Sequence, residues 1–277
     1  MKIQFLLLLF FIGSSLSSQT IELGPEEKGS RKDVISDIIL SDDTGIYALR
    51  TAVRFLSYPT PIIEKYTVDF AQVYSVRLTE FDQSNLKAQS IFPYNDRIFI
   101  ALSERDKSAG RAEFYIQEID KSTGKLTGAR KKIGANKLEK RISLPNLTSR
   151  ISRDKSKLAM FINEFALFGS GAVQIFNLPI GKKDDTYGNF TLKVFDDNLS
   201  EIWSKKVKLP YNNDRLSVLE FDTDNDGNIY LLTRYRPEDW RAKRKAKKPF
   251  FTYKILAYRN DGADVEEYDV TLENKYI

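Results

Sequence analysis

The chain has 277 residues, of which 42% are hydrophobic and 12% aromatic, so it can bury a substantial core and is not of the disordered class. Its 43 basic and 38 acidic residues give a net charge of +5, which is a small imbalance on a highly charged chain. The sequence contains no cysteine and no histidine. Disulfides, nucleophile systems that need histidine, and zinc sites built on either residue are therefore excluded.

The first 18 residues predict a secretory signal peptide. Lys2 precedes an apolar run at residues 5–12, and small residues occupy 13–18. No later segment approaches the ~18 consecutive apolar residues of a membrane helix. We expect a signal peptide at 1–18, a linker at 19–33 and an exported mature protein that is secreted or periplasmic, with no transmembrane segment. Without a cysteine at the cleavage site, it is not expected to be a lipoprotein.

From residue 34 onward, one order of parts recurs four times: an apolar strand, a polar turn, a second apolar strand, then a third strand, another turn and a fourth strand. The first strand pairs lie at 37–53, 87–104, 150–165 and 216–235, and the second pairs lie at 62–78, 112–133, 189–209 and 250–270. Enrichment in β-branched and aromatic residues favours strands. The acidic pairs at 42–43, 184–185 and 196–197 are in turn contexts, so we expect polar turns there. No helix of ten or more residues is expected in the mature chain, because Gly128 and Gly134 interrupt the helix-tolerant stretch at 125–140.

Three repeats carry insertions at 50–61, 165–188 and 236–249, each between the second and third strands. This order of strands resembles the blade of a β-propeller, in which four antiparallel strands form each sheet around an axis. The segment "ISRDKSKLA" (151–159) is similar to the turn of Tol-associated and WD-type propeller repeats, with Arg153 in place of a proline and Ser156 in place of a glycine. The whole pattern resembles exported propeller proteins of Gram-negative bacteria. It implies an all-β fold, a β-propeller with about four recognisable blades at 34–277, and insertions that share one face.

"NKYI" (274–277) lies where the first strand of another repeat would begin. We therefore expect the propeller domain to be incomplete at its carboxyl end. The alternative is a four-bladed or open β-sheet protein with an ordinary tail.

The stretch "RAKRKAKKP" (241–249) holds six basic residues and no acidic one. It follows Trp240, and an exposed tryptophan beside basic side chains suits a protein or glycan contact. The candidate partner-binding residues are Trp240, Arg241, Lys243, Arg244 and Lys245. The alternatives are a solvated basic loop and a tryptophan that only anchors it. Because no aromatic residue alternates with the charges, no nucleic-acid partner is expected.

"FDTDNDGNIYLLTRY" (221–235) places Asp222, Asp224 and Asp226 at alternate positions before Gly227. An EF-hand loop also needs a glutamate at its twelfth position, where this chain has Thr233. A weak calcium site on the three aspartates stays as one hypothesis, and no other cofactor is expected. The favoured interpretation is a hairpin turn.

Two functions fit these features. The preferred hypothesis is a non-enzymatic exported propeller module that binds a protein or glycan partner at the cell envelope through its long loops. The alternative is a propeller hydrolase or lyase that acts on polysaccharide with carboxylate chemistry, which requires carboxyl groups that converge in one pocket.

Overall fold

The computed structural model of the chain describes residues 33–52, 60–82, 85–106, 108–137, 146–163, 187–212 and 216–270. The expected signal peptide (1–18), all of the linker except Asp33, residues 165–186 of the third insertion, and the expected strand entry at 274–277 lie outside these ranges. Within the described ranges, no helix has the length and apolar character needed to cross a membrane.

The described residues form four antiparallel sheets of four strands each, and the strands of each sheet are neighbours in the order in which they follow along the chain. Sheet 1 comprises β1 (Asp33–Asp42), β2 (Gly45–Ala52), β3 (Pro61–Tyr66) and β4 (Gln72–Arg77). Sheet 2 comprises β5 (Leu86–Tyr94), β6 (Arg97–Asp106), β7 (Arg111–Ile119) and β8 (Leu126–Lys137). Sheet 3 comprises β9 (Asn146–Ile151), β10 (Leu158–Asn163), β11 (Tyr187–Phe195) and β12 (Glu201–Asn212). Sheet 4 comprises β13 (Leu216–Thr223), β14 (Ile229–Tyr235), β15 (Thr252–Arg259) and β16 (Asp264–Val270).

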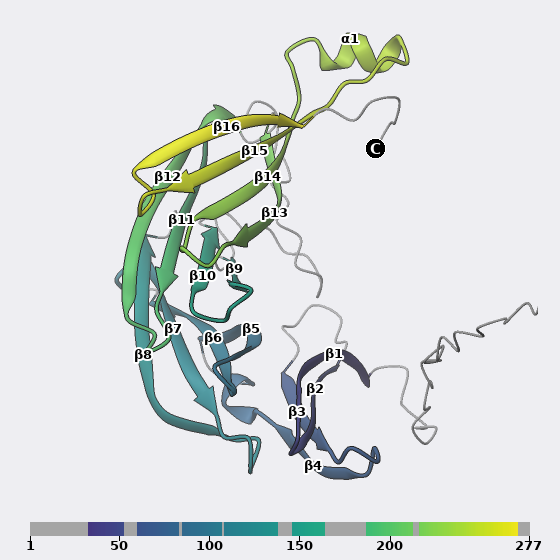
Figure 1. Ribbon diagram of the computed structural model, residues 1–277, viewed down its shortest axis with the longest axis vertical. Coiled ribbons are helices and arrows are strands. Elements are labelled where there is room, and N and C mark those ends of the chain that lie inside the picture. The colour runs from purple at the N-terminus through teal and green to yellow at the C-terminus, as the bar shows by residue number, and fades with distance from the viewer. Residues whose placement is uncertain are drawn as a thin grey trace, which may run out of the picture.

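The predicted all-β fold with four repeated sheets is confirmed, and the fold is propeller-like. Figure 1 shows the four sheets following one another along a curve, with sheet 1 and sheet 4 at its two ends. The first strands carry the succession, since β1 contacts β5, β5 contacts β9, and β9 contacts β13. This packing of successive four-stranded sheets through their first strands is the arrangement expected of blades.

The turns between the first and second strands adopt backbone conformations that their sequences predict. Asn95 and Asp96 have φ angles of 49° and 58° between β5 and β6, as a two-residue hairpin turn requires. Gly45, with a φ of 134°, opens β2, and a Cβ atom there would lie 2.1 Å from the carbonyl oxygen of Tyr66. Only glycine therefore fits at this approach of β2 to β3.

Strand alternation places apolar side chains on both faces of the inner sheets. In β6, Ile98 and Ile100 face the core shared by sheets 1 and 2, whereas Phe99 faces the core shared by sheets 2 and 3. Successive residues of a strand point to opposite faces, so the continuous apolar run of β6 is explained by burial on both sides. The third core, between sheets 3 and 4, includes Trp203, which is 7% exposed.

Two local features add detail to the sequence-based expectations. The glycine-interrupted stretch at 125–140 contains β8, as the strand pair expected at 112–133 implies, with two register shifts in the β7–β8 pairing. The described residues also contain two short helices, η1 (Thr79–Phe81) and α1 (Trp240–Lys245). Both are shorter than the ten residues that periodicity detects, and α1 lies in the stretch that was expected to be a basic loop.

Candidate functional site

The connection between β14 and β15, residues 236–251, is the insertion of sheet 4 and is called the α1 loop below. Figure 1 shows α1 beyond the ends of β14 and β15, standing away from the body of the sheets. Because connections between elements are where binding residues gather on a rigid scaffold, this loop is the first place to look for a function.

Backbone hydrogen bonds within the α1 loop give it a defined shape. The N–H of Lys243 donates to the carbonyl of Asp239 at 3.0 Å, and that of Ala246 donates to Ala242 at 2.9 Å. After the helix, the N–H of Lys248 donates to the carbonyl of Lys243 at 2.9 Å, and Lys247 has a φ of 55°. These bonds close the carboxyl end of α1 and return the chain toward β15.

Aromatic and arginine side chains in contact with one another fix the base of the α1 loop. The rings of Trp240 and Phe250 have centroids 6.4 Å apart, and those of Phe250 and Phe251 are 4.2 Å apart. The guanidinium carbon of Arg236 lies 5.4 Å from the Trp240 ring and 5.2 Å from the Phe251 ring. Cation–π contacts at partly exposed sites contribute about 0.5–1 kcal/mol each, so several of them together hold the helix in place.

The α1 loop accounts for the whole excess of positive charge on the chain. It contains seven basic residues and two acidic ones. Removing these from the totals of 43 and 38 leaves 36 of each sign in the rest of the sequence. The net charge of +5 is therefore concentrated on a loop of 16 residues, where it gives a local field that attracts anions.

The predicted partner-binding residues all lie on α1. Arg241, Arg244 and Lys245 are exposed, and Lys243 is half-exposed with its ammonium 3.1 Å from the carboxylate of Asp239. Trp240 is half-buried and contacts the aromatic residues and arginines of its own connection. Through these contacts Trp240 anchors the helix, and the anchored helix holds the charged side chains of Arg241, Arg244 and Lys245 at the surface.

Asp222, Asp224 and Asp226 lie at and after the end of β13, and the structure gives the central one a turn-forming role. The carboxylate of Asp224 accepts hydrogen bonds from the backbone N–H groups of Asp226 (3.0 Å) and Asn228 (2.9 Å) and from the Tyr230 hydroxyl (2.8 Å). Burial raises the pKa of Asp224, but these donors together with the Asn228 side chain outweigh it and lower the pKa. The predicted hairpin turn is present between β13 and β14.

No group of three or more Asp, Glu, His or Cys side chains among the described residues is arranged to hold a metal ion. Asp222 accepts a hydrogen bond from the N–H of Thr223 at 2.9 Å. The calcium hypothesis stays a prediction, and the observed bonds of Asp224 support the turn.

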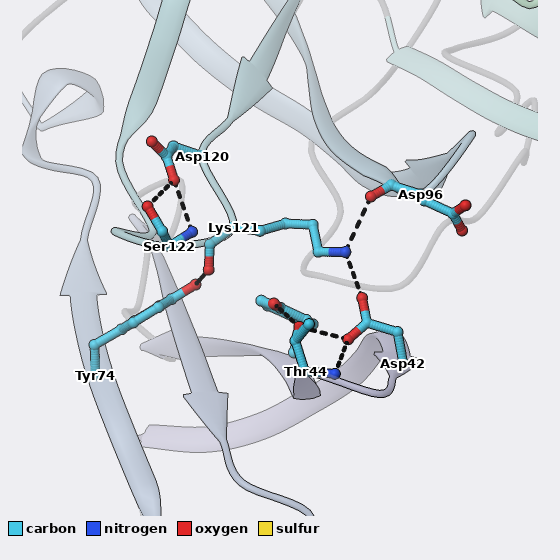
Figure 2. Close-up of polar contacts among 8 residues, drawn as sticks. Asp42, Thr44, Tyr74, Asp96, Asp120, Lys121 and Ser122 are labelled. Carbon is cyan, nitrogen blue, oxygen red and sulfur yellow. Dashed lines mark hydrogen bonds and ion pairs between the residues drawn. The ribbon is translucent and has the colours of Figure 1, made fainter.

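A polar cluster between sheets 1 and 2 was not predicted (Figure 2). Lys121, in the turn between β7 and β8, donates to the carboxylate of Asp42 and, at 3.1 Å, to the carbonyl of Asp96. Its own carbonyl accepts from the Tyr74 hydroxyl at 3.1 Å. One lysine thus joins turns of two sheets. The cluster was missed because Asp42 and Lys121 are 79 residues apart, and the only signal in the sequence was a polar turn at each end.

The electrostatics of this cluster follow from the ion pair. Burial raises the pKa of Asp42, but the hydrogen bonds from Lys121 and Thr44 outweigh it and lower the pKa to about 2. The hydrogen bond to Asp42 raises the pKa of Lys121. Both groups are charged at neutral pH and neutralise each other, so the cluster joins two sheets and leaves little charge for a ligand.

Carboxylates also gather in a shallow cleft at the ends of β6 and β7, which includes Glu104, Asp106 and Glu113. The carboxylate of Glu113 lies 2.7 Å from Arg111 and 2.6 Å from Lys132, and Glu104 lies 3.6 Å from Arg130. The hydrogen bond from Lys132 lowers the pKa of Glu113. The acids in this cleft are therefore paired with basic residues of their own sheet.

No protein-family model matches the chain, and no curated protein matches it. Among solved structures, the chain is similar to the endo-arabinase from Bacteroides thetaiotaomicron VPI-5482, with a TM-score of 0.36 and 11% sequence identity over 87% of this chain and 76% of that chain. The assignment of a propeller-like all-β fold to this chain rests on its own four sheets.

Proposed function

We propose that this chain is an exported, non-enzymatic binding module that recognises an anionic partner, protein or glycan, at the cell envelope through the α1 loop. The observation that carries the proposal is the concentration of the net charge of +5 on the α1 loop, while the rest of the sequence is balanced. Export and the cell-envelope location come from the expected signal peptide. The four sheets serve as the scaffold on which the loop is presented.

The shape of the α1 loop supports binding over a solvated basic segment. The tilted ring contact of Trp240 with Phe250, and the contacts of Arg236 and Arg241 with the Trp240 ring, order the helix before any partner arrives. An interface that is already ordered loses less conformational entropy on association, so more of its interaction energy appears as affinity. Arg241, Arg244 and Lys245 are left exposed to meet the partner.

The pKa shifts favour binding over the hydrolase or lyase alternative. A glycoside hydrolase needs one carboxyl group with a raised pKa to protonate the leaving oxygen. Eight described carboxyl groups have a pKa that is lowered on balance, and these groups are Asp42, Glu64, Asp106, Glu113, Asp120, Asp154, Glu201 and Asp224. They are held as anions by donors, which suits structural turns and ion pairs.

The experiment compares the binding of the purified chain to a polygalacturonate, a poly-glutamate peptide and neutral dextran. We expect binding to one of the two anionic polymers, no binding to dextran, and an affinity that falls as salt screens the charges. Replacing Arg241, Arg244 and Lys245 by glutamate removes three attractions between a basic side chain and an anionic group of the polymer. Each attraction contributes about 1 kcal/mol in water, so the affinity should fall roughly 100-fold.

The matched control reverses three exposed basic residues elsewhere, Lys125, Arg153 and Lys155, which gives the same net charge. The control should bind as the unmodified chain does. Equal loss in both triple variants would show that only the total charge matters, and absence of binding to both anionic polymers would refute the proposed function.

A further inference from the structure

Sheets 1 and 4 each have one face that is not packed against another described sheet. Figure 1 shows these two sheets at opposite ends of the curve. Between the ends, one face of each sheet packs on the opposite face of the next and forms one of the three cores. The two remaining faces, called the end faces of sheet 1 and sheet 4, contain no residue of the α1 loop. What they bind is therefore independent of the proposed function.

The end face of sheet 4 is apolar and aromatic. Leu256 and Tyr258 of β15 face the core shared with sheet 3, so Ile255, at an alternating position, faces away from it. Ile255 pairs with Leu232 of β14 and with Tyr268 of β16, and directly paired residues share a face of a sheet. Tyr268 is 44% exposed. This row of three side chains across three strands is typical of a surface that packs on another sheet.

Tyr268 occupies the register position from which other sheets reach their neighbour. Counting back three residues from the start of the pairing between the second and third strands identifies this position in sheets 2, 3 and 4. The fourth-strand residues there are Lys131, Lys205 and Tyr268. Lys131 donates to the carbonyl of Leu199 in sheet 3, and Lys205 donates to the carbonyl of Gly262 in sheet 4. Each acceptor lies in the turn between the third and fourth strands of the next sheet, so Tyr268 is placed to reach the same turn of a further sheet.

A tyrosine can form this bond. In sheet 1, the Tyr74 hydroxyl of β4 donates to the carbonyl of Lys121, in the corresponding turn of sheet 2, at 3.1 Å. The Tyr268 hydroxyl donates to the carboxylate of Glu266 on its own strand. The guanidinium of Arg259 lies 3.4 Å from the same carboxylate, so Glu266 keeps a partner when the Tyr268 hydroxyl turns to a carbonyl of another sheet.

Sheet 1 has a turn with the required backbone geometry. In the turn of sheet 3 that accepts from Lys131, the N–H of Leu199 donates to the carbonyl of Asp196 at 3.0 Å, and Leu199 has a φ of 60°. Between β3 and β4 of sheet 1, the N–H of Phe70 donates to the carbonyl of Thr67 at 3.0 Å, and Phe70 has a φ of 62°. The Phe70 carbonyl is therefore the equivalent of the Leu199 carbonyl.

The end face of sheet 1 can be covered without leaving an unpaired charge. Tyr47 of β2 faces the core shared with sheet 2, so its neighbour Ala48 lies on the end face. Ile38 of β1 pairs with Ala48 and is 54% exposed. On the same face, Arg50 forms an ion pair with Glu64 at 2.9 Å. Because this pair is formed within the sheet, a sheet that packs over it meets a neutral surface.

We propose that two copies of this chain associate head to tail, with the end face of sheet 4 in each copy packed on the end face of sheet 1 in the other. Tyr268 of one copy reaches the turn at Phe70 of its partner, and Ile255 and Leu232 pack near Ile38. The second copy is the occupant because one chain carries both the donor position and the matching acceptor turn, at opposite ends of the curve. Two such contacts close a ring. The ring has eight sheets, four from each copy, and propellers of about four to eight blades are typical.

Sedimentation equilibrium of the purified chain over a wide range of concentration tests the association. We expect a reversible equilibrium between one chain and two chains. A single chain at every concentration would overturn the proposal. Growth beyond two chains would also overturn it, because the two contacts would then not close.

Two substitutions on opposite end faces locate the contact. Tyr268→Glu and Ile38→Lys should each weaken the association by roughly tenfold or more, as substitutions of large side chains at the centre of an interface do. Val265→Glu and Val34→Lys are the matched controls. They make the same charge changes at exposed positions on the opposite faces of the same two strands, and they should leave the association unchanged. An equal effect of the controls would contradict the assigned faces.

Mixing the Tyr268→Glu and Ile38→Lys variants tests the head-to-tail arrangement. A mixed pair keeps one unaltered contact, between sheet 4 of the Ile38→Lys chain and sheet 1 of the Tyr268→Glu chain. We expect one-to-one dimers in the mixture at a concentration where neither variant associates alone. Unweakened association of either variant alone would mean that two copies of the same sheet meet, and no association in the mixture would mean that the end faces do not meet. Both results would overturn the proposal. Thermal unfolding checks that each variant is folded.

Discussion

Basic residues in two regions of the molecule differ in the partners that the fold gives them. In the cluster between sheets 1 and 2, Lys121 donates to Asp42 and to the carbonyl of Asp96, and its charge is neutralised within the chain. In the α1 loop, Lys245 and Arg244 are exposed on a helix whose first residue, Trp240, contacts the ring of Phe250. The difference is one of partners supplied by the fold: a facing turn brings Asp42 to Lys121, whereas α1 stands away from the other sheets (Figure 1).

A basic residue of this chain therefore indicates binding only where the fold gives it no acidic partner that neutralises its charge. Lys121 should influence stability and leave binding unchanged. The residues of α1 should influence binding and leave stability unchanged. Three substitutions and one change of pH test this division of roles.

Replacing Lys121 by methionine should lower the free energy of unfolding by about 2 kcal/mol. The substitution keeps the alkyl chain but removes the cation paired with the part-buried Asp42 carboxylate, and it removes the lysine donor to the Asp96 carbonyl. Urea unfolding measures the change. Binding to the anionic polymer should be unchanged. A loss of binding with unchanged stability would contradict the structural role of Lys121.

Lowering the pH should remove the contribution of Asp42. Its pKa falls from 3.8 to about 2 in the folded chain, so its stabilisation is fully present above the unfolded pKa of about 3.8 and is lost as the pH falls through about 2. The contribution is about 1–2 kcal/mol. Unfolding at several pH values, compared with Asp42→Asn, isolates it: the difference between the two proteins should shrink between pH 5 and pH 2, and a constant difference would contradict the ion pair.

Replacing Trp240 by alanine should weaken binding of the anionic polymer about tenfold, which is about 1.4 kcal/mol. The helix loses its ring contact with Phe250, so the exposed charges are no longer ordered before binding. Trp240→Phe keeps a ring and should recover most of the affinity. Stability to urea should change by less than about 0.5 kcal/mol. If Trp240→Phe binds as weakly as the alanine variant, the indole itself contacts the partner.

Replacing Lys243 by glutamine should have the smallest effect. The substitution removes a pair with Asp239 at helix spacing, and such pairs contribute about 0.3–0.5 kcal/mol. Helix content of the loop, followed by the protection of the Ala246 amide from hydrogen exchange, should fall slightly. A large loss of global stability would show that α1 is part of the core. It would contradict the division between α1, which is expected to act in binding, and the polar cluster around Lys121, which is expected to act in stability.

Much of the fold was predictable because its signals are local. Apolar strands separated by Asn-Asp and Asp-Gly turns predicted the pairing of β5 with β6 and of β13 with β14. The hairpin at Asp224 was anticipated, since aspartate and glycine favour such turns. The candidate site was only half predictable: the charges of α1 were visible in the sequence, but the helix was not, because six residues are too few to show a period.

The strand order, the turns and the place where positive charge accumulates could be predicted from short patterns, because they depend on residues close together in the chain. Which charged side chains are free of a partner within the chain, and so can bind a ligand, depends on contacts between sheets. Asp42 reaches Lys121 and Lys205 reaches Gly262 across 79 and 57 residues, through the packing of one sheet on the next. Contacts between sheets at such separations are set by the summed packing of the cores, which no short pattern in the sequence encodes.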